Sequence, residues 1–112
     1  MTCKHRAVGL IAVGLLVGAT AHAGEMPEYE LVIRNHQFAP STLKAPANTK
    51  FKVRVTNEDR TPSEFESSDF NREKIVTPGN TVTVFIGPLE KGQYEFFDDF
   101  HQDTAHGVLI VE

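Results

Sequence analysis

Short runs of alternating apolar and polar residues occur in the middle and in the second half of this chain and predict strands. Over residues 50–56, Phe and two Val alternate with Lys, Arg and Thr, which is the period of two that a half-buried strand produces. The same alternation returns over residues 81–86. Apolar-rich runs at 30–36, from Tyr94 onward and at 108–111 predict further strands.

Turn-forming residues separate these runs, and no amphipathic helix longer than about ten residues is predicted. Pro-Gly-Asn at residues 78–80 and Gly-Pro at 87–88 are typical turn sequences. Residues 69–74 are predicted to form a loop or a single turn of helix. Many short strands at this spacing are typical of a sandwich or barrel, so the predicted fold class is all-β.

The first 23 residues have the pattern of a secretory signal peptide. A short basic region precedes an apolar stretch over residues 7–19, and Ala-His-Ala at 21–23 is the small-x-small pattern that signal peptidase recognises. We predict cleavage after Ala23, which leaves one domain over residues 24–112. The apolar stretch is shorter than the roughly 20 residues needed to span a bilayer, so a retained membrane anchor is the less favoured alternative. The mature protein is expected to be soluble and outside the cytoplasm.

Removal of this segment changes the composition in two ways. The single cysteine, Cys3, is lost, so the mature chain has no disulfide, thiolate ligand or cysteine nucleophile. All 15 acidic residues remain, whereas two of the 11 basic residues leave, so the net charge changes from −4 to −6. An acidic surface argues against nucleic acid and anionic membranes as partners, and it favours cations.

Two glutamates that follow the run at 50–56 are the first candidates for metal-binding chemistry. Glu64 and Glu66 lie on one face of an extended segment, with Phe65 on the other. In the alternative interpretation, Phe65 enters the core and both glutamates are simply solvated, which is common for carboxylates. The spacing by itself favours that alternative.

A second candidate lies in the stretch over residues 94–107, which is rich in acidic residues and contains two histidines. If Phe96 faces the core, Asp98 follows on the same inward face, where a carboxylate is costly unless it is paired, protonated or metal-bound. His101 and His106 follow closely enough to return toward it, and oxygen with imidazole ligands suits Cu(II), Fe(II), Mn(II) or Zn(II). Alternatively, the strand ends earlier, Asp98 lies in water and His106 is an exposed loop residue.

His36 is a third position, and its role is left open. It lies two residues before Phe38, at the end of the predicted strand over residues 30–36. A strand-end histidine is usually structural or solvated, and a ligand role is the alternative.

The order of these features resembles the cupredoxin family. The resemblance rests on Phe-Ala-Pro at 38–40, the loop over 57–65, Gly79, Gly-x-Tyr-x-Phe at 92–96, and Gly107 before an apolar C-terminal run. It covers nearly all of the mature chain and implies a single Greek-key β-sandwich.

The four ligand positions of blue-copper cupredoxins, laid onto this chain, fall at Ser63 or Glu64, Asp98, His101 and about His106. Only His101 keeps the expected residue type, and without a thiolate no blue-copper site can form. The substituted set is richer in oxygen. It is similar to the periplasmic cupredoxin-like proteins that accompany high-affinity iron permeases, and to the cupredoxin domain of EfeO-type iron-uptake proteins. In those proteins an aromatic residue flanked by glutamates stands at the first-histidine position.

The resemblance implies a periplasmic protein that binds copper or iron, other than as type 1 copper, and acts in iron uptake. Its implied partners are a periplasmic iron-binding protein and a membrane iron permease. Its implied metal ligands are Glu64, Glu66, Asp98, His101 and His106. Three functions remain open: a metal carrier, an accessory ferroxidase component with turnover, or a metal-free β-sandwich interaction domain. The sequence contains no hydrolase motif.

Overall fold

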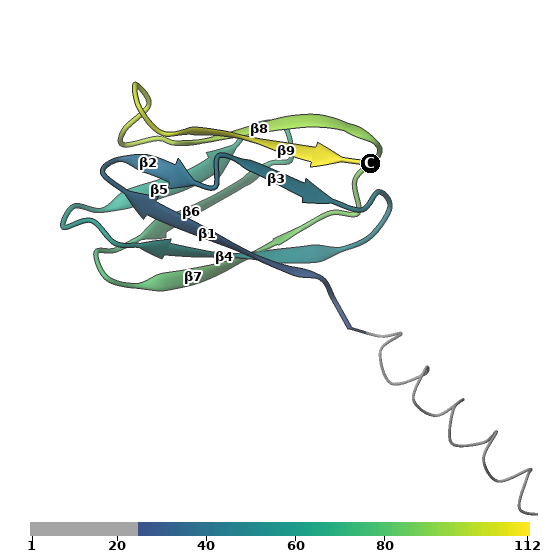
Figure 1. The fold of residues 1–112 in the computed structure, drawn as a ribbon, viewed down its shortest axis with the longest axis horizontal. Coiled ribbons are helices and arrows are strands. Elements are labelled where there is room, and N and C mark those ends of the chain that lie inside the picture. Colours follow the sequence, from purple (N-terminus) through teal and green to yellow (C-terminus); the bar gives the residue numbers. More distant parts are fainter. Residues whose placement is uncertain (1–24) are drawn as a thin grey trace, which may run out of the picture.

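The computed structural model describes residues 25–112, so the predicted signal peptide over residues 1–23 lies outside the described residues. Within that part the chain forms nine strands in two facing sheets, which confirms the predicted all-β sandwich (Figure 1). None of the described residues belongs to a helix that could cross a membrane. The strands are β1 (Glu28–Arg34), β2 (Gln37–Ala39), β3 (Thr42–Ala45), β4 (Phe51–Asn57), β5 (Ser63–Ser67), β6 (Arg72–Val76), β7 (Thr81–Ile86), β8 (Gly92–Asp98) and β9 (His106–Val111).

The first sheet has the strand order β2-β1-β4-β7. Strands β1 and β4 run parallel, with Ile33 opposite Asn57, and β7 pairs antiparallel with β4. Every second residue of β4 faces the core, so Phe51, Val53 and Val55 are completely buried. This is the alternation predicted for residues 50–56.

The second sheet has the order β3-β9-β8-β5-β6. In its middle, Phe65 of β5 lies opposite Asp98 of β8, and Glu66 lies opposite Phe97. His106 of β9 continues the second row, because it pairs with Phe97. Since partners share a face, Phe65 and Asp98 point into the sandwich, whereas Glu66, Phe97 and His106 lie on its outer face.

Buried phenylalanines fill the space between the sheets. The Phe38 ring meets Phe96 edge to face at 5.1 Å between centroids, and the Phe65 and Phe96 rings lie 5.4 Å apart. Gly107 faces the Phe96 ring so closely that an added Cβ would overlap it. The bulk of the aromatic ring thus requires glycine at the start of β9.

The segment over residues 69–74 differs from its prediction. It turns through Asn71 and then enters β6 at Arg72, which pairs with β5. Strand β6 is at the edge of its sheet, and its first four residues are exposed. Because neither face of these four residues is buried, their sequence carries no alternation by which the strand could be recognised.

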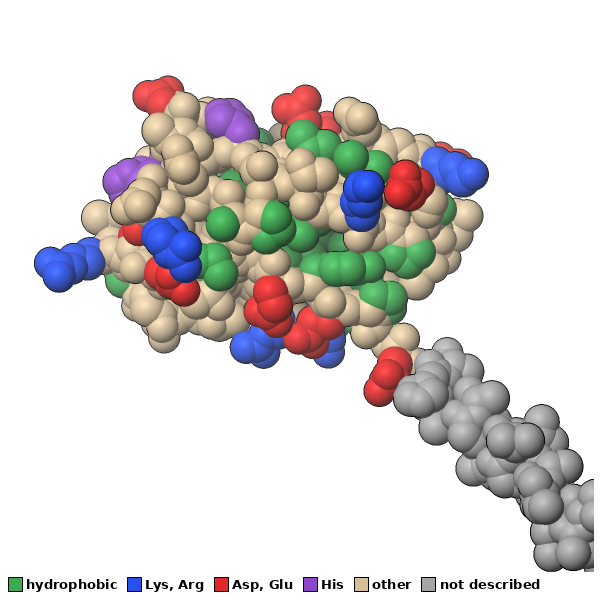
Figure 2. Space-filling model, in the orientation of Figure 1, with side chains coloured by type: hydrophobic (Ala, Val, Ile, Leu, Met, Phe, Trp, Pro, Cys, Tyr) green, Lys and Arg blue, Asp and Glu red, His purple; other side chains and the backbone are tan. Residues whose placement is uncertain are grey.

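Three of the connections at the end of the sandwich opposite the C-terminus position the candidate site (Figure 1). They are the β1–β2 turn at residues 35–36, the β4–β5 loop at 58–62 and the β8–β9 loop at 99–105. Figure 2 shows histidine side chains at this same end of the molecule. The candidate site is built from these three connections.

Candidate metal centre

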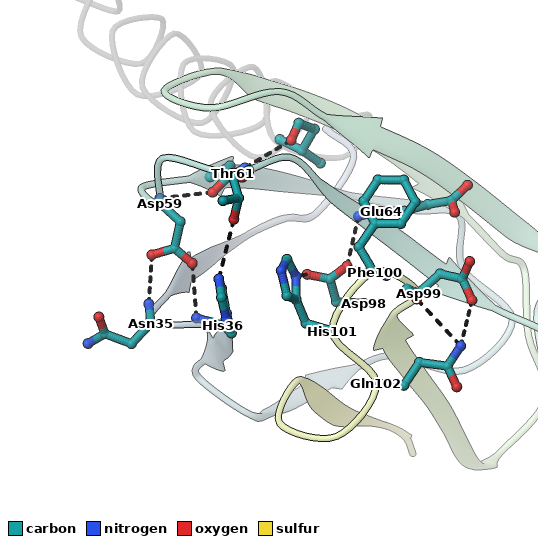
Figure 3. Close-up of polar contacts among 12 residues, drawn as sticks. Asn35, His36, Asp59, Thr61, Glu64, Asp98, Asp99, Phe100, His101 and Gln102 are labelled. Atoms are coloured by element: carbon teal, nitrogen blue, oxygen red, sulfur yellow. Dashed lines mark hydrogen bonds and ion pairs between the residues drawn. The ribbon is translucent and has the colours of Figure 1, made fainter.

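Asp98 ends β8 with a fully buried carboxylate. Its Oδ1 accepts hydrogen bonds from the backbone N–H of Glu64 at 2.9 Å and of Phe100 at 3.0 Å. Its Oδ2 lies 2.8 Å from Nδ1 of His101 (Figure 3). The prediction that Asp98 faces inward is confirmed, and both of its oxygens are partnered within the protein.

These partners keep Asp98 ionised. Burial raises the pKa of its carboxyl, but the N–H of Glu64, the imidazole of His101 and the N–H of Phe100 together hold that pKa below its usual range. Ser63 lies beside the carboxylate, but its hydroxyl is the one buried side-chain nitrogen or oxygen atom of the described residues without a hydrogen-bond partner. We therefore assign the lowered pKa to the other three donors. A neutral His101 that donates from Nδ1 to this carboxylate carries its lone pair on Nε2.

The imidazole of His101 is stacked on that of His36. The ring centroids are 3.7 Å apart and the ring planes meet at 17°. Nε2 of His36 lies 3.3 Å from Oγ1 of Thr61. Both rings line an open surface pocket together with Phe100 and Gln102, among others. Within residues 25–112, neither Nε2 of His101 nor Nδ1 of His36 has a hydrogen-bond partner.

The turn that carries His36 is fastened to the β4–β5 loop. The two carboxylate oxygens of Asp59 accept the backbone N–H of Asn35 at 2.7 Å and of His36 at 2.9 Å (Figure 3). Asp59 is itself held, because its N–H donates to Oδ1 of Asn57 at 2.9 Å. The fully buried Asn57 also donates from Nδ2 to the carbonyl oxygens of Thr61 and Val76.

A cluster of acidic side chains lies on the outer face of the second sheet, around β5. Carboxylate oxygens of Glu64, Glu66 and Asp99 lie within 4.8 Å of one another, and they are the one such metal-compatible trio of the described residues. Glu73 of β6 pairs directly with Glu66 and adds a fourth acidic side chain. In Figure 3 the carboxylates of Glu64 and Asp99 lie away from the stacked imidazoles.

Crowding of like charges marks this outer group. Partial burial raises the pKa of Glu64, and repulsion by the nearby carboxylates of Glu73, Glu66 and Asp99 raises it further. Partial burial and the negative charges of Asp99 and Glu73 likewise raise the pKa of Glu66. The ionised glutamates thus repel one another when no cation is present.

The structure divides the five predicted ligands among three places. Asp98 and His101 form one hydrogen-bonded pair at the end of the sandwich. Glu64 and Glu66 lie together on the outer sheet face with Asp99, and His106 is exposed at the start of β9. The structure does not bring all five side chains into one ligand set.

Two residues of this end are not among the predicted ligands. The role of His36 is left open because a strand-end histidine is usually structural or solvated, and Asp59 is not singled out. The predicted strand over residues 30–36 ends at Arg34 in the structure, and Asn35-His36 is a two-residue connection to β2, for which the asparagine is the available signal in the sequence. Such a connection predicts a tight hairpin that projects His36 at the sheet end.

Comparison with known proteins agrees with the fold. The family model of the cupredoxin-like domain matches residues 7–111. The chain belongs to the cupredoxin-like domain family. One relative of this cupredoxin-like protein is the uncharacterized protein RP394 of Rickettsia prowazekii (strain Madrid E). It is 45% identical over 84 residues, which are 75% of this chain and 67% of that protein.

Solved structures of other cupredoxins share the architecture. The purple cupredoxin from Nitrosopumilus maritimus is 23% identical with a TM-score of 0.59, over 75% of this chain and 99% of that one. Auracyanin A, a blue copper protein from Chloroflexus aurantiacus, is 13% identical with a TM-score of 0.68, over 79% of this chain and 100% of that one. At these identities the likeness shows the fold alone.

The cupredoxin-like family implies a bound copper ion, so the donor atoms of this site can be compared with the ligands that copper requires. A blue-copper site requires a thiolate, and residues 25–112 contain no cysteine. Asp98 stands at the position implied for that thiolate. The available donors are imidazole nitrogens and carboxylate oxygens, which do not fit type 1 copper but suit Cu(II) or an iron ion.

Proposed function

We propose that this cupredoxin-like protein binds a transition-metal ion, copper or iron, at the end of the sandwich where Asp98 holds His101. One observation carries the proposal: His101 Nδ1 lies 2.8 Å from a carboxylate that is completely buried. Metal-binding histidines commonly donate their second ring N–H to a carboxylate, which fixes both tautomer and ring orientation. His101 is then a ligand through Nε2, and Asp98 positions it.

The surroundings of His101 favour a cation. The stacked pair adjoins Asp59, and Asp103 lines the same surface pocket. The predicted mature chain is also acidic overall. The outer-face group of Glu64, Glu66 and Asp99 is the alternative location, and its oxygen-only donors favour a harder ion such as iron.

We further propose that the protein acts in periplasmic iron acquisition, with a periplasmic iron-binding protein and a membrane iron permease as partners. The support is the resemblance carried by Glu64-Phe65-Glu66 at the first-histidine position. A bound copper or iron ion would supply one-electron redox chemistry. Oxygen-dependent loss of Fe(II) in the presence of catalytic copper would identify an accessory ferroxidase component. Binding without such loss would identify a carrier.

Metal retention tests the proposed function directly. Metal-free protein over residues 24–112 is offered copper, iron, manganese and zinc together, desalted and analysed by elemental mass spectrometry. Retention of copper or iron near one equivalent supports the proposal. Retention of no metal overturns it and favours a metal-free β-sandwich interaction domain.

A further inference from the structure

We infer that the free edge of β6 is a docking site for an extended segment of a partner protein in which acidic and apolar residues alternate. Such a segment adds one strand to the second sheet, beside β6. The inference concerns a sheet edge rather than the loop end that holds Asp98 and His101, and it does not depend on the metal binding proposed above.

The direction of the backbone groups in β5 decides which groups of β6 are free. In an antiparallel ladder the N–H and C=O of one residue point to the same side, and that side alternates along the strand. The N–H of Glu64 donates to Asp98, and its C=O accepts the N–H of Asp99 at 2.9 Å. Glu64 therefore directs both groups toward the end of β8, and the next residue, Phe65, directs its own toward β6.

The residues of β6 follow the same alternation. Lys74 pairs with Phe65, so the N–H and C=O of Lys74 point to β5. Its neighbours Glu73 and Ile75 then direct theirs to the free edge, and no bond outside the strand ladders takes these groups up within residues 25–112. Ile75 is also 54% exposed, more than the other large apolar residues of this part. An open edge with an exposed apolar side chain is a template for pairing with another chain.

The adjacent edge, β7 of the first sheet, is less open. Strands β6 and β7 lie next to each other on the same side of the sandwich. A shallow groove between them is lined by Arg72, Lys74 and Phe85, among others. Nε of Arg72 donates to the backbone carbonyl of Phe85 at 2.7 Å, which occupies one edge acceptor of β7. For this reason we assign the docking site to β6.

Cations without an ionic partner flank this edge. The ion pairs within residues 25–112 involve neither Arg72 nor Lys74. Nζ of Lys50 lies near the same groove, 5.6 Å from the centroid of the Phe85 ring. The predicted mature chain is acidic overall, so this concentration of positive charge is local. Carboxylates on an added strand would complement it, because opposite charges on neighbouring strands stabilise a sheet.

The two faces of β6 specify the alternation in the partner. Partner residues opposite Arg72 and Lys74 would point into the groove, where carboxylates meet these cations. Partner residues opposite Ile75 would lie on the outer face of the sheet, beside an exposed apolar side chain. Glu73 and Glu66 are paired on that outer face and would repel a carboxylate placed there.

The same charges argue against a second copy of this chain as the occupant. Antiparallel pairing of β6 with itself, centred on Glu73 or on Lys74, would set that residue opposite its own copy. Like charges directly opposite each other are destabilising. Lysines on edge strands commonly prevent such self-pairing. They do not prevent pairing with a strand whose residues at these positions are acidic.

Nuclear magnetic resonance titration of isotope-labelled, metal-free protein over residues 24–112 tests this inference. The probe is a capped peptide of Glu-Val repeats, and a peptide of Lys-Val repeats is the comparison. Lys74→Gln removes a groove cation. Lys44→Gln is its matched control, because Lys44 is an exposed lysine of β3, the other edge strand of the same sheet. Ile75→Pro removes an N–H that points to the free edge, where proline is tolerated, and Ile75→Val keeps that N–H.

The Glu-Val peptide is expected to shift the amide signals of Glu73 and Ile75 most, and the Lys-Val peptide is expected to leave them in place. Lys74→Gln should weaken binding about threefold, the size expected for one cross-strand charge pair. Ile75→Pro should abolish binding while the signals of the other strands keep their folded positions. Lys44→Gln and Ile75→Val should bind as the unchanged protein does.

Three results would overturn the inference. The first is no response to the Glu-Val peptide at millimolar concentration, and the second is binding that Lys74→Gln leaves unchanged. The third is a different occupant: shifts of the same amides by phosphatidylglycerol vesicles but not by the peptide would indicate a lipid surface, and a sedimentation coefficient that rises with protein concentration would indicate a second copy. None of these results affects metal retention, which tests the proposed function separately.

Discussion

The backbone N–H of Glu64 donates to Oδ1 of Asp98 at 2.9 Å, whereas the carboxylate of Glu64 lies on the opposite face of the same sheet. The two faces of this sheet thus carry acidic residues in different surroundings. Asp98 is buried, ionised and fully hydrogen-bonded, so it organises the end of the sandwich. Glu64 and Glu66 are crowded at the surface, where they repel each other.

Replacing Asp98 with alanine is expected to destabilise the metal-free protein by about 3 kcal/mol. The N–H groups of Glu64 and Phe100 and Nδ1 of His101 would lose their shared acceptor in a buried site. Urea unfolding measures the change. Glu95→Ala, which removes an exposed carboxylate from the same strand, is the control. A loss for Asp98→Ala no larger than for the control would contradict the structural role.

Glu66→Gln is expected to stabilise the metal-free protein near neutral pH. The raised pKa of Glu66 means that folding favours its protonated form, so the ionised form is penalised above the folded-state pKa. Glutamine removes that penalty at neutral pH. Below the unfolded-state pKa of about 4.3 the glutamate is protonated in both states, and the difference between the two proteins should vanish.

Thermal unfolding of both proteins from pH 3 to pH 7.5 checks this sign. Glu95→Gln removes the same charge from another exposed position and is the control. A stabilisation that persists unchanged at pH 3, or appears equally in the control, would show that crowding with Asp99 and Glu73 is not its cause.

Gly107→Ala is expected to destabilise the fold by about 1–3 kcal/mol, because the new methyl group would overlap the buried Phe96 ring. Chemical denaturation measures the cost. The double variant with Phe96→Leu should show less additional cost from the alanine than the single variant does. Additive effects of the two substitutions would indicate that the methyl group does not meet the ring.

The sequence allowed the all-β fold and the inward direction of Asp98 to be predicted, because strand periodicity carries both. Phe96 and Asp98 are two residues apart, so a buried ring at one position places the carboxylate of the other inside. The same rule put Glu64 and Glu66 opposite Phe65. Periodicity does not carry the pairing of β5 with β8, which sets Phe65 beside Asp98 and brings the N–H of Glu64 to its carboxylate.

The stacking of His36 on His101 could not be predicted for a related reason. It depends on the hairpin conformation at Asn35 and His36 and on the docking of that turn by Asp59, a residue 23 positions further along the chain. Local pattern gives no direct information on contacts of this separation. The two-residue connection at residues 35–36 indicates a tight turn, but it does not indicate which residue the turn contacts.

The central claim is that a metal ion binds at the Asp98–His101 end rather than on the outer sheet face. The most direct measurement is metal stoichiometry by elemental mass spectrometry on three proteins loaded in parallel: the unchanged chain, His101→Ala, and the double variant Glu64→Gln with Glu66→Gln. Our account predicts near one equivalent of copper or iron in the unchanged chain and in the double variant, and almost none in His101→Ala. Full retention by His101→Ala with loss in the double variant would contradict it and place the ion among the outer carboxylates.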